Sequence, residues 1–207
     1  MRNTILSFLL LCPLFAAAQN NAAVILDKIV SGMKADAALQ LDYAYSVFDE
    51  DDAMVYSDNG TMKLDKECYA LDMDNMKIWC DGITQWSYMK DIDEVYITDA
   101  GSDEAQNLSP LYIMEMYREN YILELGKAPS GMLLVTMTAQ DVEAEVNRLE
   151  LLVDSGTSRL VGMFIYMPGQ GHAEVQLENY IPKCKFASDS YKCPVENFPT
   201  AEIIDMR

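Results

Sequence analysis

The sequence contains little of what most enzymes use for catalysis. Its one histidine, His172, lies beside a polar turn and has no convergent catalytic partner. There is no nucleophile elbow, phosphate-binding loop, dinucleotide-binding fingerprint or paired metal-binding motif. The acidic run at residues 91–94 lacks the ligand spacing of an EF-hand. These absences favour a protein that is not an enzyme and that uses no metal or cofactor.

Basic residues are also scarce. Lysine and arginine together number 15, against 33 aspartates and glutamates, and the formal net charge is −18. Such a charge excludes nucleic acid as a partner and disfavours direct contact with anionic lipid head groups. Self-repulsion between copies favours a monomer, and a partner that docks electrostatically should present a basic face.

Long apolar runs are missing except near the N-terminus. Arg2 precedes a short apolar stretch, Ile5 to Phe15, and Ala16-Ala17-Ala18 provides small residues for a signal peptidase. The stretch is too short to span a bilayer comfortably. The sequence therefore predicts a signal peptide at residues 1–18, a single mature domain at residues 19–207, and a periplasmic location.

One feature of this leader could instead indicate a lipoprotein. Cys12 would then be the acylated first residue of the mature chain, but the preceding Leu11 is larger than the small residue that such sites require. Cleavage before Gln19 is the preferred interpretation.

Four cysteines follow the predicted leader, an even number that suggests two disulfides in an oxidising compartment. Three pairings are possible, and we predict the local one. Cys68 and Cys80 are equidistant from Asp74 in a turn-like stretch, so a hairpin would place them opposite each other. Cys184 and Cys193 bracket a polar segment. Neither pair has the close spacing of a zinc knuckle.

Alternating apolar and polar residues dominate the rest of the chain and predict strands. From Leu41 to Val47 the period is two, and Asp58-Asn59-Gly60 and Asp81-Gly82 are typical of turns. Residues 160–167 are apolar at almost every position, which predicts a central strand covered on both faces. The expected strands lie at 41–47, 61–64, 68–73, 76–80, 85–90, 94–98, 121–125, 132–138, 145–153, 160–167 and 172–180, with an extended segment at 201–207.

Two helices are expected beside these strands. Residues 20–34 have Val24, Ile25, Ile29 and Met33 at helical spacing, with Asn20 or Asn21 as a cap. Residues 111–120 follow Ser-Pro and are apolar nearly all round, so this helix must be covered. The predicted fold is mainly β (α+β): a single curled antiparallel sheet of about ten or eleven strands that forms a half-open barrel, with both helices over its concave face.

Four segments, in the same order and with similar spacing, resemble the LolA-like lipoprotein carriers, especially the divergent Bacteroidetes-type branch. Residues 81–88 (DGITQWSY) resemble the family's "DGKTLWxY" hairpin, and residues 90–95 resemble the turn that follows it. Residues 108–111 resemble the "NP-apolar" start of the lid helix, and residues 201–207 (AEIIDMR) resemble the terminal "VEVIDLR" strand.

The resemblance implies an open barrel with a helical lid and an apolar cavity for the lipid tails of exported lipoproteins. It also implies two partners, an inner-membrane lipoprotein-releasing transporter and an outer-membrane acceptor. The family's third-strand arginine, which latches the lid, has no counterpart here: residues 63–71 contain Lys66 but no arginine. Lysine cannot make the same bidentate hydrogen bonds.

The patterns predict an exported carrier that holds acyl chains by apolar burial alone, at roughly 0.8 kcal/mol per CH2. The resemblance implies that this carrier shuttles lipoproteins through the periplasm from the inner to the outer membrane. The abundant methionine, 14 residues, suits an adaptable lining. Two alternatives stay open: an envelope interaction or sensor protein on the same fold, and a carrier of other lipids or apolar ligands. The residues expected to line the cavity are Tyr43, Tyr45, Trp86, Tyr88, Phe164 and Tyr166, and those expected on the lid are Ile113, Met114, Met116 and Tyr117.

Overall fold

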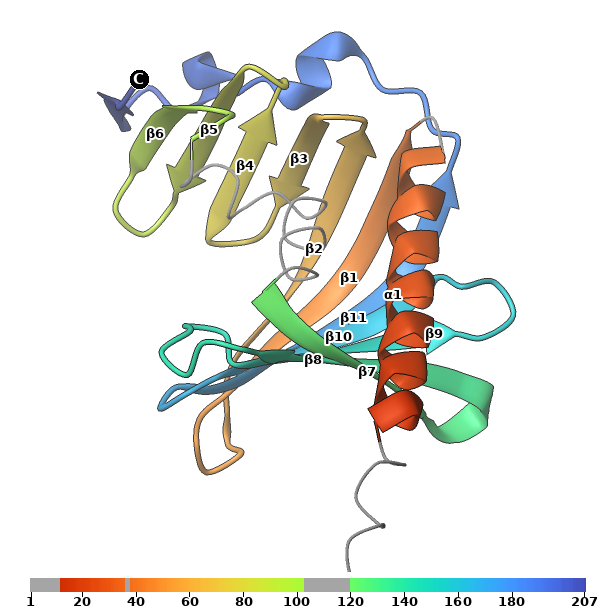
Figure 1. The fold of residues 1–207 in the computed structure, drawn as a ribbon. Coiled ribbons are helices and arrows are strands. Elements are labelled where there is room, and N and C mark those ends of the chain that lie inside the picture. The colour runs from red at the N-terminus through yellow and green to blue at the C-terminus, as the bar shows by residue number, and fades with distance from the viewer. Residues whose placement is uncertain (1–11, 36–37, 103–119) are drawn as a thin grey trace, which may run out of the picture.

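The structure, a computed structural model, describes residues 12–35, 38–102 and 120–207, which form one curled sheet and a long helix (Figure 1). Three short 3-10 helices complete the described elements. In chain order the elements are α1 (Cys12–Ala35), β1 (Leu39–Phe48), β2 (Met54–Asp65), β3 (Cys68–Asp72), β4 (Met76–Cys80), β5 (Thr84–Met89), β6 (Glu94–Asp99), β7 (Tyr121–Lys127), η1 (Pro129–Gly131), β8 (Met132–Ala139), β9 (Arg148–Asp154), β10 (Leu160–Met167), β11 (Gly171–Pro182), η2 (Ser188–Tyr191), η3 (Val195–Asn197) and β12 (Glu202–Asp205).

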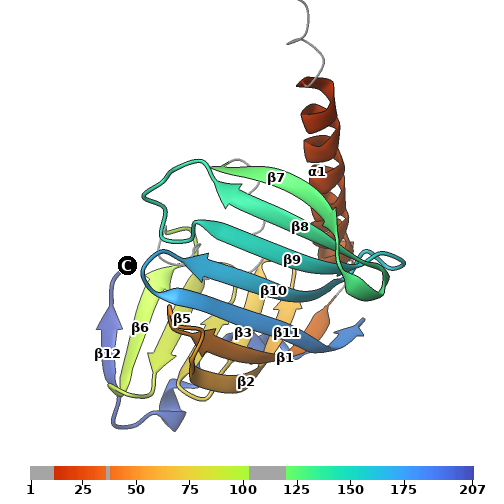
Figure 2. The ribbon, with the colours of Figure 1, turned by 90° about the horizontal axis from the view of Figure 1, so that it is seen from below.

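The strands form one 12-stranded sheet in the order β12-β6-β5-β4-β3-β2-β1-β11-β10-β9-β8-β7. Neighbouring strands are antiparallel except at one edge, where β12 pairs with β6 in parallel. A sheet of this size curls, and Figure 2 shows the two halves bent around the space on the side of α1. The edge strands β7 and β12 are not hydrogen-bonded to each other, so the predicted half-open barrel is confirmed.

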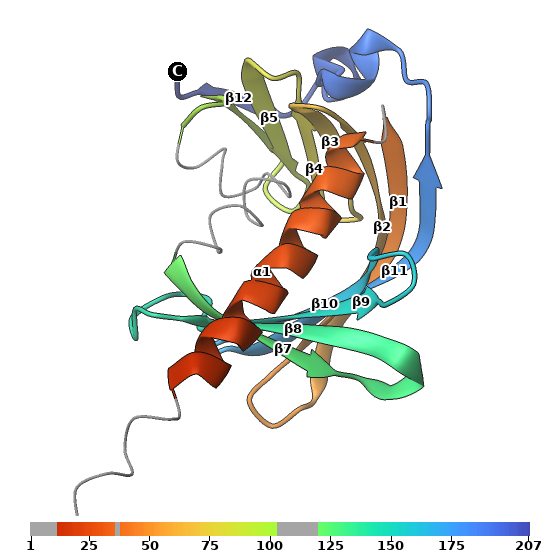
Figure 3. The same ribbon diagram turned by 45° about the vertical axis from the view of Figure 1, so that its right-hand side comes forward.

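Helix α1 lies across the concave side of the sheet, where it packs on β7 and β8 (Figures 1 and 3). It begins at Cys12, before the predicted start, so Asn20 and Asn21 lie inside the helix rather than at its cap. Its buried stripe is Ala22, Leu26, Ile29 and Met33, which follows the i, i+4, i+7 spacing of one helix face. Val24, by contrast, is 45% exposed.

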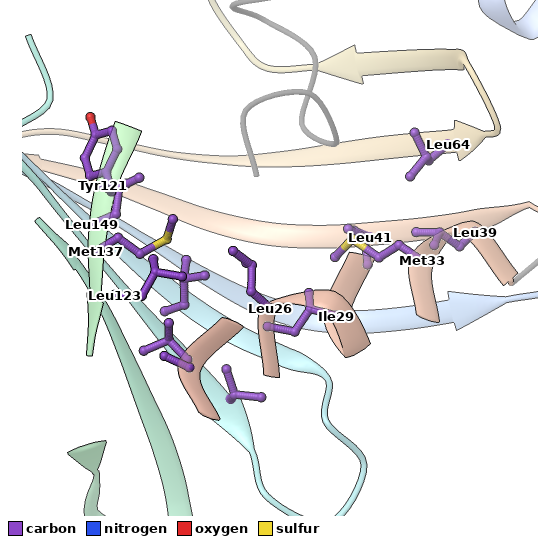
Figure 4. Packing of buried hydrophobic residues seen from close by; sticks show 14 of the residues in the cluster. Leu26, Ile29, Met33, Leu39, Leu41, Leu64, Tyr121, Leu123, Met137 and Leu149 are labelled. Atoms are coloured by element: carbon purple, nitrogen blue, oxygen red, sulfur yellow. The ribbon is translucent and has the colours of Figure 1, made fainter. Parts of the chain in front are cut away.

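The main core lies between this stripe and the neighbouring strands. Figure 4 shows Leu26, Ile29 and Met33 directed toward the sheet, with Met137 and Leu149 at one end of the cluster. Side chains on alternate positions of β7, β8 and β9 point to the same face of the sheet, which explains the burial of Leu123, Val135, Met137, Leu149 and Leu151. Alternation of this kind is also the pattern from which the strands are predicted.

The predicted turn at Asp58-Asn59-Gly60 is wrong, because all three residues lie within β2. β2 is twelve residues long, and only Thr61–Asp65 pair with β3. Gly60 lies opposite Tyr43 of β1, and the tyrosine ring occupies the space above the glycine. The glycine therefore permits close packing inside a strand.

Other turns follow the prediction. At Asp81-Gly82 the glycine has φ +86°, and the Asp81 carboxylate accepts hydrogen bonds from the backbone N–H groups of Ile83 and Thr84 at 3.0 and 2.9 Å. No helix in the described residues is both long enough and apolar enough to cross a membrane.

Candidate functional site

An apolar cavity of about 320 Å³ lies on the concave side of the sheet. Ligand-binding cavities commonly occupy ~300–1,000 Å³ and are lined mainly by apolar side chains. This cavity is lined by Met33, Leu41, Tyr43, Tyr45, Met62, Leu64, Met73, Met76, Leu160, Gly162, Met163, Val175 and Leu177.

The lining comes from neighbouring strands whose register places alternate residues on the same face. Tyr43 lies opposite Leu177, and Tyr45 lies opposite Val175. Val175 in turn lies opposite Met163 of β10. Three adjacent strands thus form a continuous apolar wall, and Met33 of α1 contributes from across the concave space.

Methionine is the commonest lining residue. Five of the thirteen lining residues are methionines, at positions 33, 62, 73, 76 and 163. An unbranched thioether has three rotatable bonds and adapts its shape to what it contacts. The lining can therefore fit a flexible apolar ligand without a fixed complementary shape.

Tyr43 is the least typical lining residue, because its side chain is only 6% exposed and its hydroxyl has no hydrogen-bond partner among the described residues. Burial raises the pKa of Tyr43 far above its usual range, and the negative charges of Asp58 and Asp72 raise it further. The hydroxyl is therefore protonated at neutral pH, and it keeps its hydrogen-bond donor and acceptor. Burial also raises the pKa of Tyr45.

Of the six residues expected to line the cavity, Tyr43 and Tyr45 do so. Trp86 and Tyr88 lie on the opposite, convex face of β5, because they pair with Trp79 and Lys77 while Ile78, between those two, faces the core. On that face the ring of Phe198 lies 4.2 Å from the ring of Tyr88. The C-terminal segment thus covers a second apolar surface.

Phe164 and Tyr166 also lie on the convex face, because they are one and three positions after Met163, which lines the cavity. Tyr166 contacts the guanidinium of Arg148, 3.8 Å from its ring centroid, and the ring of His172 at 5.6 Å. β10 is an interior strand as expected, but most of its residues stay partly exposed rather than covered on both faces.

His172 belongs to this stack of rings. Its imidazole lies parallel to Phe48 with ring centroids 4.7 Å apart, and its nitrogens lie 3.7 Å from Asp52 and 3.5 Å from Glu174. These contacts hold two hairpins together. No group of three or more metal-ligating side chains occurs in the part of the chain that the structure describes.

The expected lid residues, Ile113, Met114, Met116 and Tyr117, lie outside the described residues. Lys66, which stands in the region of the family's latching arginine, is exposed in the turn between β2 and β3, with φ 56°.

The four cysteines are free thiols in the structure, and their pairing stays a prediction. The hairpin register places Tyr69, rather than Cys68, directly opposite Cys80. Burial raises the pKa of both the Cys68 and the Cys80 thiols.

Comparison with known proteins identifies one matching family and several solved structures that are similar to this chain. Residues 13–165 match the family model described as "Outer membrane lipoprotein carrier protein LolA". No curated protein matches the sequence.

Three solved structures are similar to this chain to different degrees. An uncharacterized conserved protein from Thermus thermophilus has 10% sequence identity and a TM-score of 0.57, over 89% of this chain and 99% of that one, and it shares the fold. A DUF1329 family protein from Desulfovibrio piger has 9% identity and a TM-score of 0.49, over 86% and 98% of the two chains. The lipoprotein LppX of Mycobacterium tuberculosis has 10% identity and a TM-score of 0.46, over 81% and 99%.

Proposed function

The chain belongs to the LolA family of outer membrane lipoprotein carrier proteins, and on that premise we propose that it carries acyl chains in the apolar cavity on its concave face. The observation that carries this proposal is the cavity itself, which has a volume of about 320 Å³ and is lined mainly by apolar side chains, five of them methionine. It also contains one buried hydroxyl, that of Tyr43, with no hydrogen-bond partner in the part of the chain that the structure describes.

Acyl binding in such a cavity needs no covalent chemistry. Each methylene moved from water into an apolar lining contributes roughly 0.8 kcal/mol, so a chain of about ten methylenes supplies about 8 kcal/mol before the entropic cost of ordering it. Binding stays reversible because it depends on displaced water alone. A membrane or a second apolar site can therefore take the chain back.

We further propose the cellular role that the family suggests. The mature protein, after removal of residues 1–18, acts in the periplasm and moves lipoproteins from an inner-membrane lipoprotein-releasing transporter to an outer-membrane acceptor. The net charge of −18 suits this role, because it repels the anionic membrane surface between the two contacts. It also favours a basic docking face on each partner.

A pair of adjacent residues on β11 tests acyl binding directly. Val175 lines the cavity, and Gln176, the next residue, is exposed on the other face. Val175→Glu places a carboxylate in the apolar lining and should abolish binding of an apolar fluorescent probe. Gln176→Glu adds the same charge to the same strand and should leave binding intact.

The measurement is displacement of the probe by a fatty acid or a lipopeptide, with circular dichroism to verify folding. Leu177→Trp, which fills the cavity without adding charge, serves as a second variant if Val175→Glu does not fold. Equal probe binding in wild-type protein, Val175→Glu and Leu177→Trp would refute the proposal. Native mass spectrometry of the protein from a bacterial periplasm then identifies the cargo, since a lipoprotein, another lipid and an absent adduct have different masses.

A further inference from the structure

A second, polar groove adjoins the apolar cavity. It has a volume of about 720 Å³, and it shares two lining residues, Tyr43 and Met73, with the cavity. β2 continues past the end of β3, as Figure 1 shows, because its residues before Thr61 have no partner in β3. The groove lies where β2 extends beyond the end of β3. Because the groove and the cavity share lining residues, an amphiphile whose chain occupies the cavity can place its head group in the groove.

The groove is acidic. Five carboxylates and two lysines line it, and each lysine is paired: Lys77 with Asp72, and Lys90 with Asp74 at 3.0 Å. In the described part of the chain, three lining carboxylates form no direct ion pair with a lysine, although the charge of Lys90 helps to lower the pKa of Asp58. They belong to Asp42, Asp58 and Glu178.

Two of these carboxylates are fixed in position by neutral donors. Asp42 accepts hydrogen bonds from the amide of Gln40 at 2.9 Å, that of Asn179 at 3.1 Å and the hydroxyl of Thr61 at 3.2 Å. Asp58 accepts backbone hydrogen bonds from Asn59 at 2.7 Å and Asp74 at 2.8 Å. These bonds lower the pKa of both carboxyl groups, so both carry their charge at neutral pH.

The unpartnered hydroxyl of Tyr43 marks where a ligand is expected. It is buried against Gly60, whose backbone forms part of the groove lining. A buried hydroxyl without a hydrogen bond costs about 1–3 kcal/mol, a cost that a ligand donor would remove. An ammonium has three N–H donors, enough for one bond to this oxygen and another to Asp58, whose charge helps to raise the pKa of Tyr43. Asp42 precedes Tyr43 in β1, so its side chain points to the other face of the sheet and it contributes its charge to the groove rather than a bond beside this oxygen.

We propose that the acidic groove binds a protonated amine in the head group of the amphiphile whose acyl chain occupies the cavity. The proposal rests on the proposed function, since it requires the chain to lie in the cavity. It deepens that function by naming the class of cargo: amphiphiles with a primary amine close to the chain, in preference to neutral or anionic ones. The α-amine of a lipopeptide and the amine of a free lipid share this chemistry.

The experiment compares three twelve-carbon probes on the mature protein: dodecylamine, dodecanol and dodecanoate, each displacing an apolar fluorophore at pH 7.5. A primary amine is protonated at this pH. We expect dodecylamine to bind about threefold to tenfold more tightly than dodecanol, the range that one or two solvent-exposed charge pairs supply. Dodecanoate should bind most weakly, and added salt should reduce the amine preference.

Two variants test whether the groove causes this preference. Asp42→Asn with Asp58→Asn removes both charges but keeps the acceptor oxygens, and should bring the affinities for amine and alcohol to near equality. Glu143→Gln, on the exposed loop before β9, removes a charge outside the groove and should leave the ratio unchanged. A wild-type ratio near one, or a ratio that survives the double substitution, overturns the proposal.

The result also distinguishes this proposal from the proposed function. If dodecanol displaces the fluorophore but the amine has no advantage, the carrier function stands and the head-group site does not. If none of the probes displaces it, both are wrong.

A synthetic diacylglyceryl-cysteine peptide, free or acetylated at its α-amine, identifies the source of the amine. Weaker binding after acetylation indicates a lipoprotein N-terminus. Equal binding, with the dodecylamine preference retained, indicates a free amine lipid.

Discussion

Replacing Gly60 with alanine tests the closest packing in the site. A Cβ at this position would lie 2.8 Å from Cε2 of Tyr43 and closer still to its Cζ and hydroxyl oxygen. Such approaches are far inside van der Waals contact, and Tyr43, at 6% exposure, has little room to move. Overpacking of this kind costs about 1–3 kcal/mol. We expect Gly60→Ala to lower the free energy of unfolding by that amount and to change ligand affinity, since the displaced ring lines the cavity.

The matched control is Gly126→Ala in β7. A Cβ there would meet its nearest neighbours, atoms of Leu134, at 3.8 and 3.9 Å, which is ordinary contact. This substitution should be neutral, or should stabilise by about 0.5 kcal/mol through the smaller entropy of the unfolded chain. Urea unfolding, with an unchanged m-value, measures the change in the free energy of unfolding for both variants.

A double-mutant cycle identifies the cause. In a Tyr43→Leu background the ring is absent, so adding Gly60→Ala should cost about 1 kcal/mol less than it does in the wild type. If Gly60→Ala destabilises no more than Gly126→Ala, or if its cost is the same without the ring, the packing argument is wrong.

Three further predictions concern stability and redox state. In α1, Leu26→Ala should cost about 2–5 kcal/mol in urea unfolding because Leu26 is 1% exposed, whereas Val24→Ala, at a position 45% exposed, should stay within about 0.5 kcal/mol. The hydrogen bond from Gln40, with others, lowers the pKa of Asp42 from 3.8, so its charged form stabilises the fold above that pH and the effect is lost as pH falls through the lower folded value. The destabilisation by Asp42→Asn should therefore be larger at pH 6 than at pH 2, and equal values would contradict this. Under oxidising conditions we expect Cys68–Cys80 and Cys184–Cys193 disulfides, and non-reducing peptide mapping that found crossed pairs would refute this pairing.

Much of the fold follows from local patterns. Alternation predicts most strands because one face of this sheet is buried against α1 and the cavity while the other is more polar. The buried stripe of α1 could also have been predicted, because Ala22, Leu26, Ile29 and Met33 lie on one helix face. The predicted stripe was displaced because it included Val24 and Ile25 in place of Ala22 and Leu26.

The face of β5 could not be predicted from its own sequence. Trp86 and Tyr88 alternate with Gln85 and Ser87, a pattern that favours the aromatic residues inside. The aromatic face is instead covered from outside by Phe198 of the C-terminal segment, more than a hundred residues later in the chain. On the inner face, Gln85 is buried and accepts a hydrogen bond from the Tyr69 hydroxyl. Tertiary contacts of this range override local alternation.

Two other features, the face of β10 that lines the cavity and the position of Gly60 inside a strand, could not be predicted from the sequence either. β10 is apolar on both faces, so alternation cannot distinguish the cavity-lining Met163 from the outward Phe164. Gly60 follows Asp-Asn, a combination that local statistics assign to a turn. Only its pairing with Tyr43 shows that the missing side chain makes room for the ring.

The most deeply buried residues of the fold are separate from the cavity, although Met33, Leu41 and Leu64 belong to both the core and the cavity lining. Of the eight largest fully buried side chains, five belong to α1, β8 and β9, and none of the eight lines the cavity. The five are Leu26, Val135, Met137, Leu151 and Val153. The cavity is formed instead by β1, β2, β10 and β11 with flexible methionines. A ligand can therefore enter and leave without disturbing the densest packing. This division is what a carrier requires, because the empty and loaded forms must both be stable in water while the cargo is exchanged.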